Sequence, residues 1–217
     1  MQAPEALLQR LATVPGMESG RRRLVLLLPQ LGDFDSLEYA QALVPALPHL
    51  ASAPLELLAI GIGNAAGADR FCRFTGFPRE RLLVDGEPTL HRALGLYAGL
   101  QVPGGPWPGL LLMCAGIGSP GTLAEVLRGY SGDRTAALRP FELATVRLRN
   151  MVELLGAWRT YVPRDDHITQ RGGTYLLDRD DSLLYSYRDP GILGYSATMA
   201  DPLSFLAPYL SPSPEQP

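Results

Sequence analysis

The sequence predicts an α/β fold in which a central mixed β-sheet carries helices on both faces. Three short apolar runs, each followed by a segment with helical periodicity, predict parallel strands joined by right-handed crossovers. Two later apolar runs, separated by the polar stretch 178–182, predict a C-terminal antiparallel hairpin. The length of 217 residues fits one domain, or one domain with a large insertion.

The first 96 residues alternate between predicted helices and strands. A short helix at 4–14 precedes the strand Leu24–Leu28, and a longer helix from about 34 to 47 is ended by Pro45 and Pro48. The following elements are predicted as strand Leu55–Ile62, helix Ala65–Thr75, strand Leu82–Val84 and helix Thr89–Leu96. The glycine and proline in the stretch 76–78 mark the end of the helix Ala65–Thr75.

The pattern changes between residues 97 and 165. A breaker-rich loop at 102–108 and an apolar stretch at 109–115 precede two predicted helices, at 122–130 and 142–158. We interpret this segment as a helical insertion that covers the core and contacts a protein partner. Trp107 and arginines such as Arg149 support this interpretation, because aromatic and arginine side chains dominate binding hot spots. The alternative is a lid that only covers the sheet.

The hairpin strands are predicted at Thr174–Leu177 and Leu183–Tyr187, and a last helix at about 202–210. The proline-rich tail 211–217 is predicted to be disordered. We therefore expect one domain over residues 1–210 with the helical insertion at about 97–165.

Composition excludes several functions. The net charge is −3, so no basic footprint indicates nucleic acid. All 19 basic residues are arginine, which rules out a Schiff-base or P-loop lysine. The two cysteines, Cys72 and Cys114, make no disulfide framework, and no metal-ligand spacing is present. We expect no metal or cofactor, and a cytoplasmic protein without a membrane span, at most associated peripherally with a membrane.

Two stretches resemble a known family. The segment 70–100, RFCRFTGFPRERLLVDGEPTLHRALGLYAGL, resembles the helix–strand–helix block of peroxiredoxin-like proteins of the AhpC/TSA group. The segment 170–190, QRGGTYLLDRDDSLLYSYRDP, resembles the hairpin of that group. The resemblance implies a thioredoxin-like fold. Members without the active cysteine are familiar from cyanobacteria and plastids, so it also points to a photosynthetic organism and a stromal or thylakoid location.

The loop after the first strand departs from this family. In the family it carries the redox cysteine, whereas here it reads Gly32-Asp33-Phe34-Asp35-Ser36. Gly32 matches the family glycine, and Asp33 and Ser36 stand where the cysteines of the CxxC type stand. Neither residue can form a sulfenic acid, so peroxidase chemistry of the usual kind should be absent. The resemblance also implies that Arg171 is the arginine that helps to bind peroxide in peroxiredoxins.

Each candidate residue has a structural alternative. Asp33 and Asp35 flank a helix start, where an aspartate caps backbone N–H groups; the alternative is a site carboxylate paired with Arg171. Cys72 is either a buried small residue or a thiol whose pKa the neighbouring arginines lower. Cys114 lies in an apolar run and is expected to be packed.

Two functional hypotheses follow. In the first, the protein binds a protein partner as a scaffold, chaperone or assembly factor, through Trp107 and Arg149 of the insertion or through a cleft near Asp33, Asp35, Ser36 and Arg171. In the second, it is a divergent thiol-dependent oxidoreductase or peroxidase that uses Cys72. A carboxylate-based enzyme at Asp33 and Asp35 is a third idea, but no further motif completes it.

Overall fold

The computed structural model describes residues 1–119, 121–124, 127, 140–199 and 201–210, and of residues 140–147 the helix only. Its centre is a sheet of five strands in the order β3-β2-β1-β4-β5. The strands are β1 (Arg22–Gln30), β2 (Leu55–Ile62), β3 (Leu82–Asp85), β4 (Gly173–Leu177) and β5 (Leu183–Arg188). β1 is parallel to β2 and antiparallel to β4, which confirms the predicted mixed sheet and hairpin.

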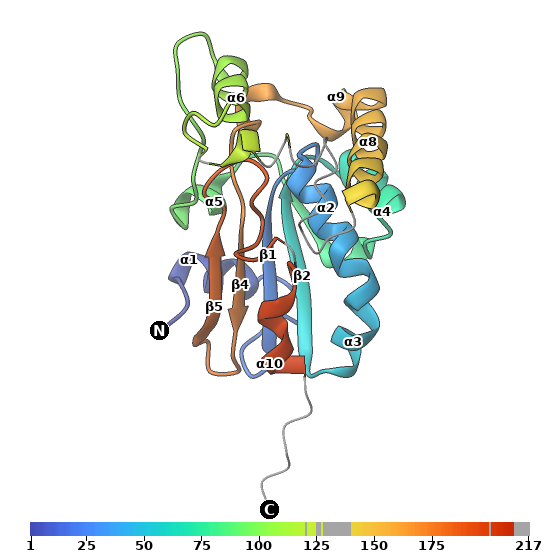
Figure 1. The fold of residues 1–217 in the computed structure, drawn as a ribbon. Helices are drawn as coiled ribbons and strands as arrows, with labels where there is room; N and C mark the ends of the chain where they lie inside the picture. The colour runs from blue at the N-terminus through green and yellow to red at the C-terminus, as the bar shows by residue number, and fades with distance from the viewer. Residues whose placement is uncertain (120, 125–126, 128–139, 200, 211–217) are drawn as a thin grey trace, which may run out of the picture.

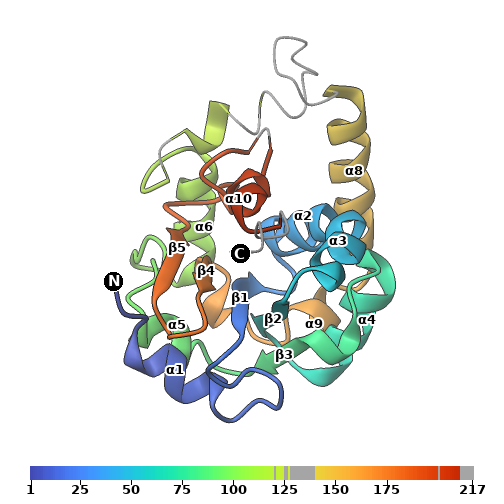
Figure 2. The same ribbon diagram turned by 90° about the horizontal axis from the view of Figure 1, so that it is seen from below.

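Side chains alternate across β1 and build one hydrophobic core on each face of the sheet. Val25 and Leu27 pack with α1 (Glu5–Leu11) and α5 (Thr89–Ala93). Leu24 and Leu26 pack with α2 (Phe34–Leu43) and α4 (Ala65–Thr75). Figure 2 shows these helices on opposite sides of the sheet. The five-stranded mixed sheet with helices on both faces is a thioredoxin-like α/β fold.

The helix predicted over 34–47 is interrupted. α2 ends at Leu43, a 3-10 turn covers Val44–Ala46, and a separate helix α3 runs over Leu47–Ser52. The two prolines have different effects from those predicted: each sits in the first turn of the next short helix, where the missing N–H costs nothing. The C-terminal helix is likewise split into a 3-10 turn (Ser204–Leu206) and α10 (Ala207–Leu210).

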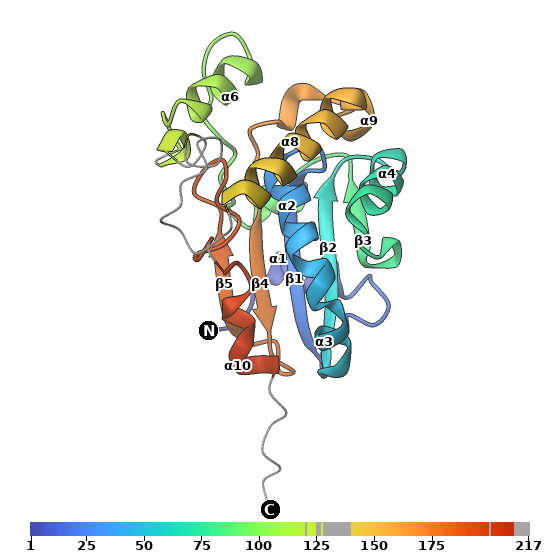
Figure 3. The same cartoon turned by 45° about the vertical axis from the view of Figure 1, so that its right-hand side comes forward.

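Three helices of the 97–165 segment gather at the end of the sheet where β1 leads into α2 (Figure 1). They are α6 (Pro106–Cys114), α8 (Pro140–Gly156) and α9 (Trp158–Tyr161). α6 corrects the sequence prediction of a loop to 108, because Pro106 and Pro108 are tolerated in its first turn. Figure 3 shows α8 and α9 on the same side as α2 and α4, with α6 apart from them.

Several predictions fall outside the described residues. They are the disordered tail 211–217, most of the predicted helix 122–130, and three further arginines of the predicted insertion, at positions 128, 134 and 139. Over the described ranges, no helix combines the length and the apolar character needed to cross a lipid bilayer.

Candidate functional site

The β1–α2 loop places Asp33 at the start of α2 as its N-cap. One Asp33 carboxylate oxygen accepts the backbone N–H of Asp35 at 2.9 Å, so the predicted capping role is confirmed. The Ser36 hydroxyl is fully buried and donates to the carbonyl oxygen of Gln30 at 2.8 Å. Gly32 lies against α9: a Cβ atom added there would come within 2.3 Å of Val162 Cγ2. Ser36 therefore has a structural role, and glycine is required by close packing.

Arg171 joins this loop from the segment before β4. Its guanidinium is 0% exposed and donates through Nη2 to the Oδ2 atom of Asp33. Nη1 lies 3.7 Å from Asp35 Oδ2, and Nε donates to the carbonyl oxygen of Thr169 at 3.1 Å. Burial alone would lower the pKa of Arg171, but the charge and hydrogen bond of Asp33 raise it. Asp33 thus caps α2 and is also paired with Arg171, and a functional role for this carboxylate stays a prediction.

Two further buried carboxyl groups surround Arg171. Asp35 accepts the backbone N–H of Gly194 at 3.2 Å, and Asp189 accepts that of Gly172 at 2.8 Å. Burial, followed by the charge of Asp33, raises the pKa of Asp35 well above its ordinary value. Burial raises the pKa of Asp189 to about 7. The cluster therefore holds more carboxyl groups than its one arginine neutralises, and it favours protonation of Asp35 and Asp189.

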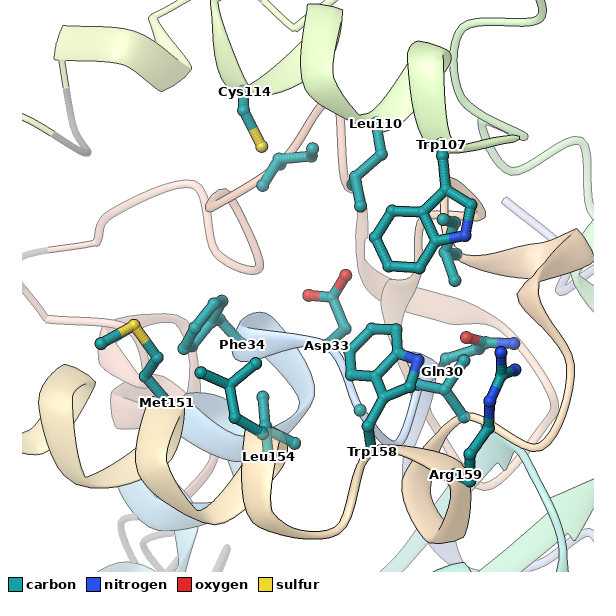
Figure 4. Close-up of a pocket in the computed structure, with 15 residues that line it drawn as sticks. Gln30, Asp33, Phe34, Trp107, Leu110, Cys114, Met151, Leu154, Trp158 and Arg159 are labelled. Carbon is teal, nitrogen blue, oxygen red and sulfur yellow. The ribbon is translucent and has the colours of Figure 1, made fainter. Parts of the chain in front are cut away.

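A pocket of about 640 Å³ opens above Asp33, between α6 on one side and α8 and α9 on the other (Figure 4). The Asp33 carboxylate points into it from the β1–α2 loop. The walls are mainly apolar and aromatic, and they include Phe34, Trp107, Leu110, Met151, Leu154 and Trp158. A volume in this range is typical of small-molecule sites.

The two tryptophans of the chain come from opposite walls and lie close together at one end of this pocket. The rings of Trp107 and Trp158 lie 5.6 Å apart, and the indole N–H of Trp107 donates to Asp165 Oδ2 at 3.0 Å. Arg159 donates to the other oxygen of Asp165 at 2.9 Å. The indole of Trp107 is therefore held in position by a polar network at the edge of the pocket, and the ring of Trp158 lies beside it.

The cysteines behave differently from each other. Cys72 is only 8% exposed, and burial raises the pKa of its thiol to about 11. The charge of Arg79 lowers this pKa, but burial has the larger effect, and the guanidinium of Arg70 is paired with Glu153 at 2.6 Å. Cys114 corrects the prediction of a packed residue: it is only partly buried and lines the pocket, although burial still raises its pKa. In the described ranges, no group of three or more His, Cys, Asp or Glu side chains is arranged to hold a metal ion.

The structure separates two residues that were assigned to one partner surface. Trp107 lines the pocket and is 43% exposed. Arg149 is outside the pocket lining, and its guanidinium lies over the ring of Phe74 of α4, 5.0 Å from the ring centroid. Arg149 therefore packs α8 against α4, whereas Trp107 belongs to the pocket.

Sequence reasoning missed Gln30, Asp189 and Trp158. Gln30 is the last residue of β1, and its position at a strand end was the one available signal. Asp189 comes directly after β5 and Trp158 starts α9, and both reach the site only through tertiary packing. Arg171, Asp33 and Asp35 were predicted as a possible group and do come together.

These features define a thioredoxin-like protein whose first strand–helix loop carries a carboxylate where the redox thiol is expected. A profile of the AhpC/TSA antioxidant enzyme family matches residues 42–191, which is more than half of the chain, and the chain belongs to this family. The matched region begins after the β1–α2 loop. No curated protein sequence matches the chain.

Two solved structures from Xanthomonas campestris are similar over most of the chain. One is of bacterioferritin comigratory protein, from a study of its alkyl peroxide reduction activity, with 14% identity and a TM-score of 0.45. The other is of peroxiredoxin Q, with 14% identity and a TM-score of 0.47. Each match covers 89% of this chain and 82% of the other.

Proposed function

We propose that this chain acts by binding a protein partner through its 97–165 segment, and that it does not reduce peroxide with a thiol. The observation that carries the proposal is where its exposed apolar side chains lie. Met1 aside, the large hydrophobic side chains exposed in the described residues all fall within this segment: Trp107, Leu111, Ile117, Leu123, Leu127, Leu148, Val152 and Leu155. Soluble proteins rarely expose many such side chains in one region unless a partner covers them.

The chemistry of the loop supports binding over peroxide reduction. The residues at the start of α2 are Asp33, Asp35 and Ser36, and none of them can be oxidised to a sulfenic acid. Arg171, the candidate for binding peroxide, is fully buried and paired with Asp33. A neutral peroxide would have to compete with a carboxylate for this guanidinium, and charge-assisted hydrogen bonds are the stronger ones.

A thiol oxidoreductase using Cys72 is the competing hypothesis, and the structure offers it little support. A thiol with a pKa of about 11 holds almost no thiolate near neutral pH, and the thiolate is the nucleophile. We expect hydrogen peroxide consumption with thioredoxin or glutathione to stay at background. Robust turnover that is lost in Cys72→Ser would overturn the proposal and establish the enzyme.

The partner we expect is a protein that this chain holds, protects or helps to assemble, in the cytoplasm, stroma or thylakoid region of a photosynthetic organism. Affinity capture from the native host, followed by mass spectrometry, tests for it. Trp107→Ala and Leu155→Glu should reduce recovery several-fold and leave the circular dichroism spectrum unchanged. The matched control is Arg92→Ala, an exposed residue of α5 on the other face of the sheet.

The role of Arg149 is tested in the same experiment. The guanidinium of Arg149 lies over the ring of Phe74. Arg149→Ala should therefore lower the free energy of unfolding and change the amount of recovered partner little. If Trp107→Ala and Leu155→Glu both retain the partner as well as the wild type does, the segment is a structural lid and the proposed function is wrong.

A further inference from the structure

We propose that residues 102–118, which we call the apolar finger, insert into the surface of a bilayer of zwitterionic lipid. The apolar finger consists of α6 and the loops on either side of it, at the end of the molecule opposite α10 (Figures 1 and 3). This contact goes beyond the proposed protein partner and does not rest on it, because vesicles can be offered to the purified chain alone.

The first support is the composition of the apolar finger. Its sequence, VPGGPWPGLLLMCAGIG, contains no charged, amide or hydroxyl side chain. Its one side-chain N–H, on the indole of Trp107, already donates to Asp165 Oδ2 at 3.0 Å. A protein interface has a polar rim and direct hydrogen bonds, whereas hydrocarbon offers no hydrogen-bond partner. The side chains of the apolar finger therefore suit lipid better than a protein surface.

The second support is that α6 is apolar on every side and only half covered. Gly109 and Met113 face the protein and are buried. Leu111 and Ile117 are 67% and 54% exposed, and Ala115 between them is exposed as well. A helix that is apolar all round is normally surrounded by apolar material. These three exposed residues form an outer face of the apolar finger, and none of them lines the pocket.

The dimensions and the first turn of α6 fit a shallow position in the bilayer. Nine residues make it about 14 Å long, against roughly 30 Å for the hydrocarbon core, so it can lie along the surface without crossing it. Interfacial helices bury their apolar face about 5–10 Å deep. Pro106 and Pro108 have no N–H, so the first turn brings fewer unpaired donors into the lipid.

The charges beside the apolar finger determine which lipid it suits. The 3-10 turn η3 (Asp165–His167) packs against α6. The ions there form pairs of opposite sign: Arg159 with Asp165 at 2.9 Å and Arg164 with Asp166 at 2.6 Å. A phosphocholine headgroup also combines one positive and one negative group, so it complements these pairs. The net charge of −3 gives no attraction to an anionic surface. Binding should therefore depend on apolar burial and little on salt.

The exposed face of α8 differs from the outer face of α6. Val152 and Leu155 are exposed, but Glu153 lies between them in the sequence and the exposed Arg149 lies just before them. Placing α8 in lipid would remove these charges from water, which is costly. A protein partner can instead pair them at a polar rim. The outer face of α6 therefore suits lipid, and the exposed face of α8 suits the protein partner.

The test is co-sedimentation of the purified chain with sucrose-loaded vesicles of phosphatidylcholine, with and without added phosphatidylglycerol, at low and high salt. We expect the wild type to bind both kinds of vesicle equally and to stay bound at high salt. Leu111→Glu and Ile117→Glu each place a charge on the outer face. Each should lower the partition coefficient by at least about tenfold, with an unchanged circular dichroism spectrum.

The matched control is Leu155→Glu on α8. Leu155 is 70% exposed against 67% for Leu111, and it receives the same charge. This variant should bind vesicles as the wild type does, although it should lose the protein partner. Leu111→Trp keeps the outer face apolar and should bind at least as tightly as the wild type, which separates loss of lipid contact from loss of folding.

Absence of binding to phosphatidylcholine vesicles would overturn the proposal, and so would equal binding by the wild type, Leu111→Glu and Ile117→Glu. Binding that needs phosphatidylglycerol and disappears at high salt would overturn it too, because that is electrostatic adsorption. A dimer that Leu111→Glu dissociates would overturn it by assigning the outer face to a second copy. These results leave partner capture through Leu155 unaffected, because capture is measured without vesicles.

Discussion

Arg171 and Asp33 form an ion pair that connects the segment before β4 to the first turn of α2. The guanidinium is wholly buried, and the side chain of Asp33 is 11% exposed. The same carboxylate caps α2 through the backbone N–H of Asp35. One carboxylate therefore accepts a hydrogen bond from the first turn of a helix and pairs with a buried cation. It stands at the position where the resemblance to the family suggests a redox thiol.

The first prediction concerns the stability of this arrangement. Asp33→Ala removes both the cap and the partner of a buried charge, and we expect it to cost about 3–5 kcal/mol. Asp33→Asn keeps a capping oxygen but removes the charge. It should cost more than the few tenths of a kcal/mol expected for a change of cap alone. Urea denaturation at pH 7 measures both changes.

The matched control for the cap is Asn64, the N-cap of α4, whose side chain accepts the backbone N–H of Gly67 at 2.8 Å. Asn64→Ala should cost about 0.5–2 kcal/mol. If Asp33→Ala costs no more than Asn64→Ala, the ion pair with Arg171 contributes nothing to stability.

The second prediction concerns the cysteines. Cys114 should react with iodoacetamide faster than Cys72 in the native protein, because Cys114 is only partly buried and lines an open pocket. Both should react more slowly than a free thiol at pH 7.5, since burial raises both pKa values. Mass spectrometry of peptides at timed intervals measures the two rates. Faster labelling of Cys72 would mean that α4 opens in solution.

The third prediction concerns pH and Asp189. The pKa of Asp189 in the folded protein is about 7, against an ordinary value of about 3.9. Between these values the folded state binds more protons than the unfolded state, so this group makes stability fall as pH rises from about 4 to about 7. Asp189→Asn mimics the protonated form. We expect it to match the wild type at about pH 3, below the unfolded pKa, and to exceed its stability at pH 8 by about 2–4 kcal/mol.

The titration of His91 makes stability rise with pH, which is opposite to the effect of Asp189. It must therefore be included in the comparison of the two proteins. It is buried, its ring nitrogen Nε2 lies 2.8 Å from the carbonyl oxygen of Leu28, and burial lowers its pKa to about 4. Its contribution to stability is complete above about pH 6.5 and is lost as pH falls to about 4. Asp189→Asn should therefore lose stability on acidification more steeply than the wild type. Parallel pH profiles for the two proteins would contradict the assignment to Asp189.

The sequence allowed the sheet to be predicted well because its strands are short apolar runs bounded by breakers. β2 and α4 begin and end at the predicted residues. The errors occurred at prolines, because a proline can either end a helix or occupy the first turn of the next one. Pro45, Pro48, Pro106 and Pro108 were taken as breaks, but each lies at or near the first turn of a short helix. The packing of the preceding segment decides whether such a proline ends a helix or begins one.

The site was predictable only in part. Asp33 and Arg171 could be paired because the strand–helix loop and the hairpin each have a recognisable pattern. The pocket could not be predicted, because its walls come from helices that are distant in the chain. Trp107 and Trp158 meet across the gap between α6 and α9, and Cys114 faces Asp33 only because α6 lies above the loop (Figure 4). Periodicity predicts that a helix has an apolar face, but it does not predict which element that face meets.

The last prediction concerns how α8, which forms one wall of the pocket, is held against the core. Glu153 of α8 accepts two hydrogen bonds from Arg70 of α4, at 2.6 and 3.2 Å, and one from the hydroxyl of Tyr161 at 2.8 Å. One turn earlier, Asn150 is fully buried and exchanges amide hydrogen bonds with Gln41 of α2, at 2.9 and 3.1 Å.

Asn150→Asp should destabilise this contact more than Glu153→Gln does. An aspartate at 150 has no N–H to donate to Gln41 and places a charge in a buried position, whereas glutamine at 153 still accepts from Arg70 and Tyr161. Hydrogen–deuterium exchange should show faster exchange in α8 of Asn150→Asp, with β1 and β2 unchanged. Unchanged exchange in α8 would mean that the apolar contacts of Leu154 and Trp158 hold the wall in place without the Gln41–Asn150 pair.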